Sequence, residues 1–312
     1  MKILITGAGG FMGKHLIDFF LEKDFEVCGT YYNPSSNLSE INEKAELIEL
    51  DVRDKSRFSW VLDKIKPERI YHLAAQSLPT VSWRDPGYTM EVNGIGTINL
   101  FENVRSLNLD PKILVACSSA QYGYVTEEEV PVKESKNFKP LHPYGVSKVC
   151  QELLSYQYFK CYGMKSVNAR IFNTTGPGKR NDVCSDFTKR IVEIEKGKRE
   201  FLPVGNLETK RPICDVRDLI EAFWLATEKG KVGESYNLSG DKVYMIKELL
   251  DKMKAMSDAK FEVKQDKNLI RPTDEPIIFG DSGKFIKDTG WEQKIGIEKT
   301  LGDMLEYWRK DV

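Results

Sequence analysis

The sequence contains no long apolar segment. Its longest uninterrupted apolar runs are the five-residue segments Ile113–Cys117 and Ala222–Ala226, whereas a helix that crosses a bilayer needs about 20 such residues. Met1–Ile5 is followed directly by a threonine and a glycine, so it is too short for the apolar core of a secretion signal. The absence of both kinds of segment predicts a cytoplasmic protein.

Metal-binding patterns and an excess of charge of one sign are missing as well. The six cysteines form no C-x-x-C pair, and the chain has only three histidines. We therefore predict reduced thiols and no metal site. Lys and Arg number 46 and Asp and Glu 47, which gives a formal net charge of -1. This balance argues against nucleic acid or a membrane surface as a partner bound through bulk charge.

Short β-rich runs alternate with amphipathic segments in the first half of the chain. Strands are expected at Ile3–Thr6, Glu26–Tyr31, Leu47–Leu50, Arg69–Leu73, Lys112–Cys117, Lys165–Ile171 and Ser235–Leu238. Helices are expected at Phe11–Leu21, Lys55–Lys64, Gly96–Ser106, Tyr144–Tyr162, Asp186–Lys196, Arg217–Lys229 and Ile246–Ser257. The alternation predicts βαβ units and therefore an α/β fold with a doubly wound parallel sheet.

The 312 residues are enough for roughly two domains. We assign residues 1–173 and about 215–240 to the sheet domain. Residues 174–214 and 241–312 are expected to form a smaller C-terminal α/β lobe that binds substrate. The C-terminal stretch looks irregular because it is rich in proline and charge.

A glycine-rich turn follows the first predicted strand and opens the first predicted helix. Gly7, Gly10 and Gly13 give the spacing G-x-x-G-x-x-G. Such glycines permit a tight turn, let the backbone approach a pyrophosphate and pack the helix on the strand. The helix N-terminus then offers free N–H groups to the anion. The turn predicts a dinucleotide site, which includes Phe11 and Met12.

The end of the second strand bears on the choice of dinucleotide. No Asp or Glu occurs from Val27 through Ser39, so the carboxylate that would bind a ribose 2′-hydroxyl is missing. No Lys or Arg occurs there either, although polar residues around Tyr32 and Asn33 can donate hydrogen bonds to a phosphate. We predict NADP, with NAD possible. The simpler interpretation is a surface loop with weak selectivity.

Tyr144 and Lys148 form a Y-x-x-x-K pair. Pro143 suits the first position of a helix, so both side chains should share one helix face. An ammonium beside a phenol is expected to lower the pKa of the phenol and make it a usable acid/base. Ser118 follows the strand Lys112–Cys117, at the carboxyl end where parallel sheets bind ligands. Its hydroxyl can bond a substrate oxygen that the tyrosine protonates. The simpler interpretation of a Y-x-x-x-K pattern in an arbitrary protein is a pair of exposed side chains on a helix.

Together these motifs resemble the extended branch of the short-chain dehydrogenase/reductase family, whose members include nucleotide-sugar epimerases, dehydratases and reductases. The resemblance extends over nearly the whole chain and adds a Rossmann-like fold to the expectations. It implies adenine contacts from Asp51 and Val52, cofactor contacts from Leu73, Ala74 and Ala75, a nicotinamide-ribose contact from Lys148, and a diphosphate contact from Asn173. Taken alone, Asp51 fits a turn cap equally well, and Asn93 fits a buried structural amide.

Further segments resemble the subgroup of GDP-mannose 4,6-dehydratases and GDP-4-keto-6-deoxymannose reductases. The segments are Ala75–Ser77 with Ser82-Trp83, Gly205–Glu208 with Arg211, and Arg271–Asp274. Guanidinium groups match phosphate oxygens in pairs, so Arg211 and Arg271 are the candidate diphosphate ligands, with surface ion pairs as the alternative. The resemblance places Val183 near the base. Candidate residues of the sugar pocket are Gln76, Ser77, Ser82 and Ser119.

One position separates dehydration from reduction. The dehydratases that this sequence resembles have a glutamate two residues after the serine or threonine at the strand end. This sequence has Ala120 at that position. Removal of a C5 proton needs a general base, and a methyl group cannot supply one. We predict an NADPH-dependent reductase of a GDP-4-keto-6-deoxy-hexose that gives GDP-rhamnose or its C4 epimer.

The alternatives are a 4,6-dehydratase with a base from elsewhere, such as Glu127–Glu129, and a 4-epimerase. A non-enzymatic scaffold is disfavoured because Ser118, Tyr144 and Lys148 are all present. The family resemblance also implies a homodimer, formed through the helices near Gly96–Ser106 and Tyr144–Tyr162.

Overall fold

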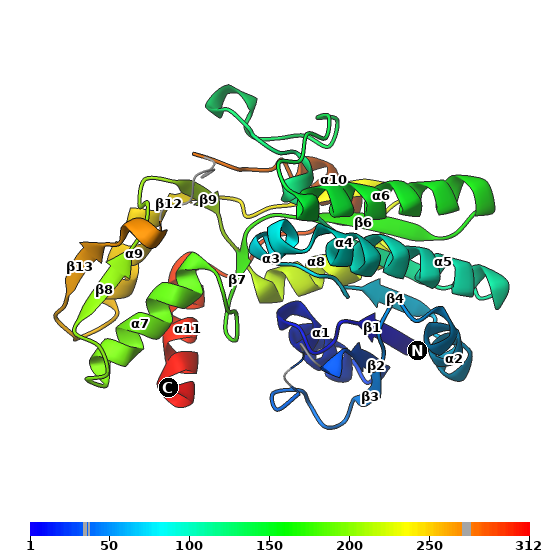
Figure 1. Ribbon diagram of the computed structural model, residues 1–312, viewed down its shortest axis with the longest axis horizontal. Coiled ribbons are helices and arrows are strands. Elements are labelled where there is room, and N and C mark those ends of the chain that lie inside the picture. The colour runs from blue at the N-terminus through cyan, green and yellow to red at the C-terminus, as the bar shows by residue number, and fades with distance from the viewer. Residues whose placement is uncertain (34–35, 37, 270–275) are drawn as a thin grey trace.

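A seven-stranded parallel sheet forms the centre of the molecule in the computed structural model, which describes residues 1–33, 36, 38–269 and 276–312 (Figure 1). The strand order is β11-β6-β5-β4-β1-β2-β3, so the order reverses beside β1. The strands are β1 (Lys2–Thr6), β2 (Glu26–Tyr31), β3 (Glu46–Glu49), β4 (Arg69–His72), β5 (Lys112–Ser118), β6 (Ser166–Ile171) and β11 (Ser235–Leu238). The predicted doubly wound α/β fold is confirmed.

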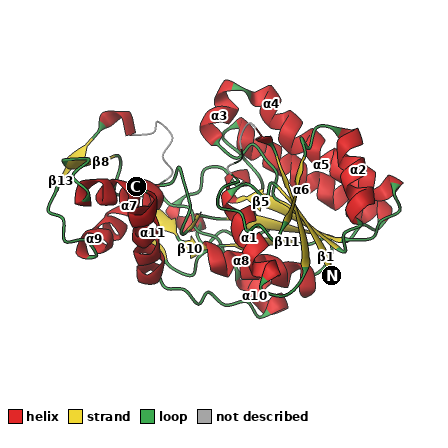
Figure 2. Ribbon diagram, turned by 90° about the horizontal axis from the view of Figure 1, so that it is seen from below, coloured by secondary structure: helices red, strands yellow, loops and turns green. Residues whose placement is uncertain are grey.

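Helices cover both faces of this sheet (Figure 2). On one face α1 and α8 contribute to an apolar core, and on the other face α2 and α5 do so. Their bounds are α1 (Phe11–Leu21), α2 (Lys55–Ile65), α5 (Gly96–Ser106) and α8 (Val216–Glu228). In α1 the buried Leu16, Ile17 and Phe20 recur at helical spacing, so one stripe of the helix faces the strands.

The segment between β4 and β6 carries further helices near the carboxyl ends of the strands. They are α3 (Pro79–Arg84), α4 (Pro86–Met90), the π-helical turn η2 (Glu91–Ile95), the 3-10 turns η3 (Ser119–Gln121) and η4 (Glu127–Glu129), and α6 (Pro143–Tyr162). Helix α6 begins at the predicted proline, and the side chain of His142 caps it by accepting a hydrogen bond from the backbone of Gly145.

A separate apolar cluster lies beyond the sheet and unites α7, α9 and α11 (Figure 2). The elements of this part are α7 (Val183–Glu195), β8 (Phe201–Val204), β9 (Lys210–Pro212), β12 (Val243–Met245), α9 (Ile246–Ala255), β13 (Glu262–Gln265), the 3-10 turn η5 (Lys267–Leu269) and α11 (Ile297–Asp311). The short pair β7 (Thr174–Thr175) and β10 (Cys214–Asp215) brings together the two chain segments that join this part to the sheet.

The expectation of an irregular C-terminal stretch is wrong, because α10 (Gly283–Thr289) and α11 lie there. The buried positions of α11 include Leu301, Met304, Leu305 and Trp308, a helical spacing. The charged residues between them are partly or fully exposed, and they obscured the pattern.

Helix α10 packs against β11 and α8 rather than within the apolar cluster of the smaller part, although it lies in the stretch 241–312 assigned to that lobe. The division into domains stays a prediction. Within the described residues, no helix is long and apolar enough to cross a membrane.

Candidate active site

The turn from β1 into α1 has the geometry of an anion site. Gly7 has a φ of +73°, and a Cβ there would lie 2.8 Å from the Cα of Ala74. The glycine therefore lets the turn run against the chain that leaves β4. Gly10 caps α1 without a side-chain hydrogen bond, so the first N–H groups of the helix can meet an anion. These residues fit the pyrophosphate of a dinucleotide.

A buried polar cluster lies beneath this turn. The Thr6 hydroxyl accepts a hydrogen bond from the backbone N–H of Ala74 and contacts His72 Nδ1 at 2.8 Å. On its other side, His72 Nε2 contacts the Thr97 hydroxyl. Burial lowers the pKa of His72 to about 3, so its ring stays neutral. The cluster fixes the backbone of the predicted cofactor residues after β4, a role of Thr6 that sequence reasoning missed.

The Asp51 carboxylate caps the turn after β3 and also forms an ion pair. It accepts the backbone N–H of Arg53 at 3.0 Å and pairs with the Arg53 guanidinium at 2.7 Å. These hydrogen bonds hold the pKa of Asp51 below its usual value. The neighbouring Val52 is buried, and its carbonyl accepts a hydrogen bond from Asn99. Arg53 was not predicted, and it also pairs with Glu91, which is remote in sequence.

The loop after β2 approaches α1 and α11. Here the backbone N–H of Tyr32 donates to Ser36. Glu40, the first acid of this loop, accepts from Lys14 Nζ at 2.6 Å and from the Tyr307 hydroxyl at 2.6 Å. Its carboxylate is therefore engaged in these contacts. Asn33 lies at the start of the same loop.

Ser118, Tyr144 and Lys148 are brought together by the packing of α6 on the end of β5. A Cβ at Gly145 would lie only 2.7 Å from the carbonyl oxygen of Ala120. A glycine therefore allows α6 to touch the turn that follows Ser118, and a hydrogen bond joins Ser118 to Tyr144. Lys148 Nζ lies 5.7 Å from the centre of the Tyr144 ring and donates to the carbonyl of Ala116 at 2.8 Å.

The expected lowering of the tyrosine pKa by the lysine is wrong for this structure. Burial raises the pKa of Tyr144 to about 12, although the hydrogen bond with Ser118 opposes the rise. Burial also lowers the pKa of Lys148 to about 8. The ammonium bonds to a carbonyl instead of the phenol oxygen, so the cost of desolvation outweighs its attraction for phenolate. A protonated Tyr144 is suited to donate a proton.

The predicted sugar-pocket residues fall into two groups. The side chain of Gln76 bonds to Leu78 and Thr89, and the buried Ser82 donates to the carbonyl of Pro79. Both side chains therefore bond within their own segment. Ser77 is exposed, and Ser119 is partly exposed at the carboxyl end of β5.

Of the residues predicted to bind the diphosphate and the base, Asn173, Val183 and Arg211 lie among the described residues. Asn173 follows β6, and its buried Oδ1 has no hydrogen-bond partner among the described residues. Val183 begins α7 directly after the capping Asp182. Arg211 lies on β9 and donates to the carbonyl of Lys210 at 2.8 Å. Arg271 lies outside the described residues.

Comparison with known proteins decides the family. The family model described as GDP-mannose 4,6 dehydratase matches residues 4–304. The chain belongs to this family. GDP-mannose 4,6 dehydratase 1 of Arabidopsis thaliana is 32% identical over 322 residues, covering 97% of this chain and 88% of that protein. GDP-6-deoxy-D-mannose reductase of Pseudomonas aeruginosa is 27% identical over 313 residues, covering 100% and 98%.

A solved structure agrees with this assignment. The structure of RMD from Pseudomonas aeruginosa, complexed with NADPH, superposes with a TM-score of 0.86 and 25% identity, covering 100% of this chain and 99% of that one. The predicted resemblance is confirmed. As a member of the GDP-mannose 4,6-dehydratase family, the chain is an NAD(P)-dependent enzyme of nucleotide-sugar metabolism.

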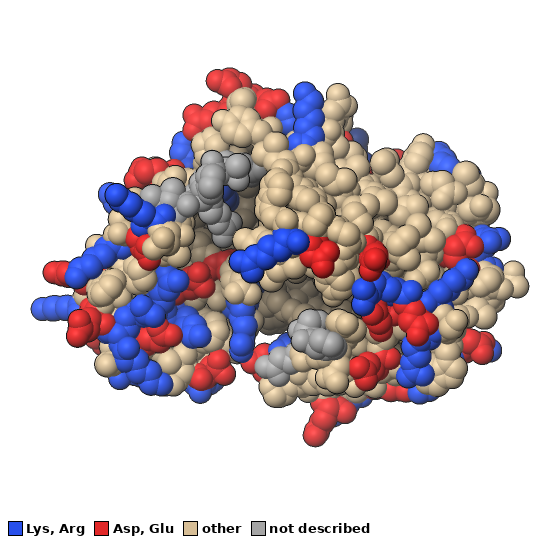
Figure 3. Space-filling view, viewed as in Figure 1, with Lys and Arg blue, Asp and Glu red and all other residues tan. Residues whose placement is uncertain are grey.

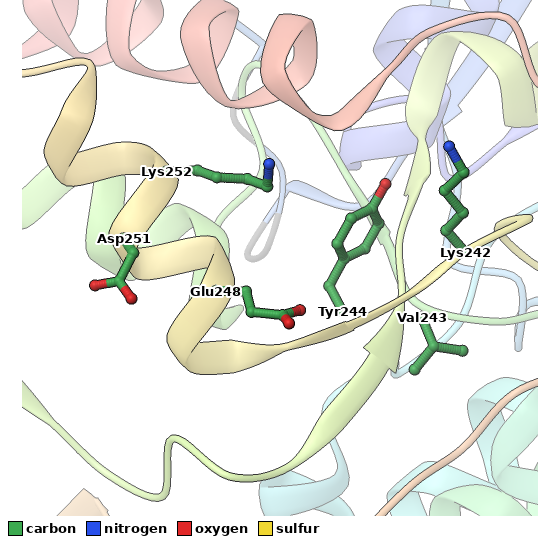
Figure 4. Close-up of a pocket in the computed structure, with 6 residues that line it drawn as sticks. All are labelled: Lys242, Val243, Tyr244, Glu248, Asp251 and Lys252. Atoms are coloured by element: carbon green, nitrogen blue, oxygen red, sulfur yellow. The ribbon is translucent and has the colours of Figure 1, made fainter.

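The molecular surface is hollowed in two places. The face in Figure 3 is hollowed where the sheet and the smaller part meet, and basic side chains lie beside the hollow. A second pocket of about 600 Å³ lies on the smaller part (Figure 4). Its lining includes Lys242, Tyr244 and Glu248 but none of the predicted site residues. Within the described residues, no group of His, Cys, Asp or Glu side chains could hold a metal ion.

Proposed function

We propose that this member of the GDP-mannose 4,6-dehydratase family reduces the C4 ketone of a GDP-4-keto-6-deoxy-hexose with NADPH. The supporting observation is Ala120, which follows Ser118 at the position where the dehydratases of the resemblance have glutamate. Reduction needs one proton donor at the carbonyl oxygen, and Tyr144 supplies it. Dehydration needs a further base at C5, which Ala120 cannot supply.

The nearby acids that could replace such a base are engaged elsewhere. Glu127 pairs with Lys210 at 3.1 Å, and Glu129 pairs with Lys136. A hydrogen bond with Thr126 lowers the pKa of Glu128. All three glutamates lie in the exposed turn η4. This arrangement supports reduction over elimination.

Ser118, Tyr144 and Lys148 form the proposed catalytic triad. They have separate roles in the proposed reaction. A bound NADPH would supply the hydride for the new C–H bond at C4 and would become NADP⁺. Tyr144 transfers its phenolic proton to the carbonyl oxygen, so the ketone becomes an alcohol and the phenolate regains a proton from solvent. Ser118 donates a hydrogen bond that polarises the carbonyl. Lys148 holds the nicotinamide ribose.

The preference for NADPH over NADH is part of the proposal. No acid precedes Glu40 in the loop after β2, and Lys14 and Tyr307 hold the Glu40 carboxylate. The first residues after β2 therefore include no carboxylate that would repel a 2′-phosphate. Tyr32 and Asn33 begin this loop.

The proposed GDP substrate would lie between the sheet and the smaller part. Asn173 supports this placement, because its amide group borders β7 and has an oxygen without a partner among the described residues. Arg211 on β9 is the predicted cationic ligand of the diphosphate. Arg271 and Val183 remain predicted ligands of the diphosphate and the base.

We also propose that the enzyme is a homodimer. Apolar side chains on the outer surface of α6 and at the start of α5 are about half exposed, namely Val146, Leu153, Tyr156 and Ile95. Helices α5 and α6 pack side by side, so two copies of this surface can form a four-helix interface. Burial of these side chains would favour association.

The direct test is incubation of the purified chain with GDP-4-keto-6-deoxymannose and NADPH. We expect substrate-dependent loss of NADPH absorbance and a 6-deoxy sugar product. The Tyr144→Phe variant should retain NADPH binding and lose about 10²- to 10⁴-fold in turnover. Absence of NADPH consumption by the wild-type enzyme would refute the proposal.

A second incubation, with GDP-mannose and no added NADPH, distinguishes the alternatives. A 4-keto-6-deoxy product would identify a dehydratase, whose base must then come from outside position 120. Inversion at C4 without net cofactor consumption would identify an epimerase. The reductase proposal predicts that GDP-mannose is unchanged.

A further inference from the structure

Gln121 links the catalytic serine to the protein interior. Its side chain is completely buried. The Oε1 atom accepts the backbone N–H of Ser118 at 2.9 Å, and Nε2 donates to Glu152 Oε2 at 2.7 Å. The Ser118 hydroxyl in turn accepts the backbone N–H of Ala120 at 3.2 Å. Both ends of the amide are therefore engaged, and their partners fix its orientation.

Glu152 is itself held rigidly on α6. Arg170 on β6 donates from Nε to Glu152 Oε2 at 2.9 Å, and the Ser235 hydroxyl on β11 donates to Oε1 at 2.8 Å. The Glu152 and Arg170 side chains are 7% and 6% exposed. Burial alone would raise the pKa of Glu152, but Arg170 and the other donors lower it, so it remains a carboxylate.

An amide suits the gap between these two partners. The N–H of Ser118 requires an acceptor, and the carboxylate of Glu152 requires a donor. An apolar side chain would leave the Ser118 N–H unpaired in the interior and would remove one of the donors to Glu152, which is costly. A carboxylate would accept from Ser118 but would repel Glu152.

We propose that Gln121 is a positioning residue for Ser118. It holds the turn after β5 so that the Ser118 hydroxyl faces Tyr144 and the substrate carbonyl. The inference rests on the proposed reaction for the role of Ser118, but the contacts themselves do not depend on which nucleotide sugar is used. Gln121 acts through Ser118 and does not take part in proton transfer.

Two substitutions test the proposal. Gln121→Met keeps the length of the side chain and removes both hydrogen bonds, so kcat should fall by about 10- to 100-fold through loss of alignment. Gln121→Glu can reproduce both bonds while its carboxyl is protonated, because the acid then has one donor and one acceptor. Once the pH is high enough for the introduced carboxyl to ionise beside Glu152, two adjacent carboxylates repel each other and the link breaks.

The expected result for Gln121→Glu is a kcat close to that of the wild type at low pH and progressively lower than wild type as the pH rises. The charged and titratable groups around this position are Cys117, Tyr122, Lys148, Glu152 and Arg170. They are present in both proteins, so the ratio of variant to wild-type kcat isolates the new carboxyl. A ratio that does not change with pH would overturn the proposal, as would a Gln121→Met kcat within about twofold of wild type.

Tyr122→Phe is the matched control. It removes a buried hydroxyl that accepts from Arg170 and donates to Asn237, each at 2.6 Å, and leaves both bonds of Gln121 in place. We expect lower stability and a kcat within about twofold of wild type. An equal loss of kcat in Tyr122→Phe and Gln121→Met would show a general effect of the network and contradict a specific role of Gln121.

Hydrogen exchange at the Ser118 amide separates this proposal from the proposed reaction. Exchange should be faster in Gln121→Met than in wild type or Tyr122→Phe, whatever substrate the enzyme uses. Unchanged exchange with normal reductase activity in the wild type would refute the positioning role alone. Faster exchange in Gln121→Met, together with a wild-type enzyme that has no reductase activity, would refute the proposed reaction alone.

Discussion

At the scale of single residues, the acid and the cation of the triad have opposite pKa shifts with one cause. Burial favours the neutral form of each side chain, so the pKa of Tyr144 rises to about 12 and that of Lys148 falls to about 8. A tyrosine that keeps its proton suits the reductive direction, in which it must donate. The lysine is the group of this pair that changes charge near working pH.

The Lys148 shift predicts a dependence of stability on pH. Between its folded pKa of about 8 and its ordinary value of 10.5, the unfolded chain binds the proton more tightly than the folded chain. The free energy of unfolding should therefore increase as the pH rises through this window, because Lys148 loses its proton in the folded chain first. Below pH 8 the cost of burying the ammonium is constant. Tyr144 acts in the opposite direction only above pH 10, where an unfolded tyrosine loses its proton.

The measurement is urea unfolding of wild type and Lys148→Met across this range. Lys148→Met lacks the titrating group, so its stability advantage over wild type should be largest near pH 7 and smaller by roughly 2 kcal/mol near pH 10. A difference in stability that is the same at every pH would contradict the assigned shift.

At the scale of elements, the site depends on the contact between the end of β5 and the first turn of α6. Pro143 and the His142 cap fix where α6 begins, and Gly145 lets its backbone touch the turn that contains Ala120. The side chains of Tyr144 and Ser118 meet as a result of that contact. The arrangement therefore tolerates little change at Gly145.

Gly145→Ala should separate the two elements. The new Cβ would lie 2.7 Å from the Ala120 carbonyl oxygen and 2.8 Å from Pro140 Cβ. We expect a loss of about 1–3 kcal/mol in stability from overpacking and a decrease in kcat of about tenfold or more from misalignment.

Gly302→Ala is the control for this substitution. Gly302 lies inside α11, and a Cβ there meets nothing within 4 Å. Because alanine favours a helix by about 1 kcal/mol over glycine, this variant should be as stable as wild type or more stable. Thermal unfolding and steady-state kinetics of both variants measure the difference. Equal behaviour of the two would contradict the tight contact at Gly145.

At the scale of the whole molecule, the outer surface of α6 stands out among the helices around the sheet. Its exposed Val146, Leu153 and Tyr156 are large apolar or aromatic side chains, and they lie on one side of the helix. The proposed homodimer would bury this surface. It lies away from the smaller part, so two substrate sites could remain open.

Leu153→Asp is expected to weaken the dimer by at least about 100-fold, because a carboxylate would be buried in an apolar interface. Sedimentation at several protein concentrations measures the change. The control is Ile286→Asp on α10, which replaces an apolar side chain of similar exposure, 47% against 56%, outside the proposed interface. A monomeric wild type, or the same effect from both substitutions, would refute this interface.

Local patterns determined much of the fold and part of the site. Alternating strands and helices predicted the parallel sheet, because the two apolar periodicities are properties of short segments. The strands at Glu26–Tyr31 and Ser235–Leu238 and the helices at Phe11–Leu21 and Gly96–Ser106 begin and end as expected. Helix α11 was missed because its charged face dominates its composition.

The sequence by itself determined which residues are proposed to carry the chemistry. The glycine turn, Ser118, Tyr144 and Lys148 lie in short motifs whose spacing follows from the geometry of a strand end or a helix turn. Only the tertiary structure decided their environment. The link from Ser118 through Gln121 to Glu152 and Arg170 joins β5, η3, α6 and β6, and burial sets the pKa of both Tyr144 and Lys148. Desolvation and buried hydrogen bonds depend on packing between distant segments, which spacing along the chain does not encode.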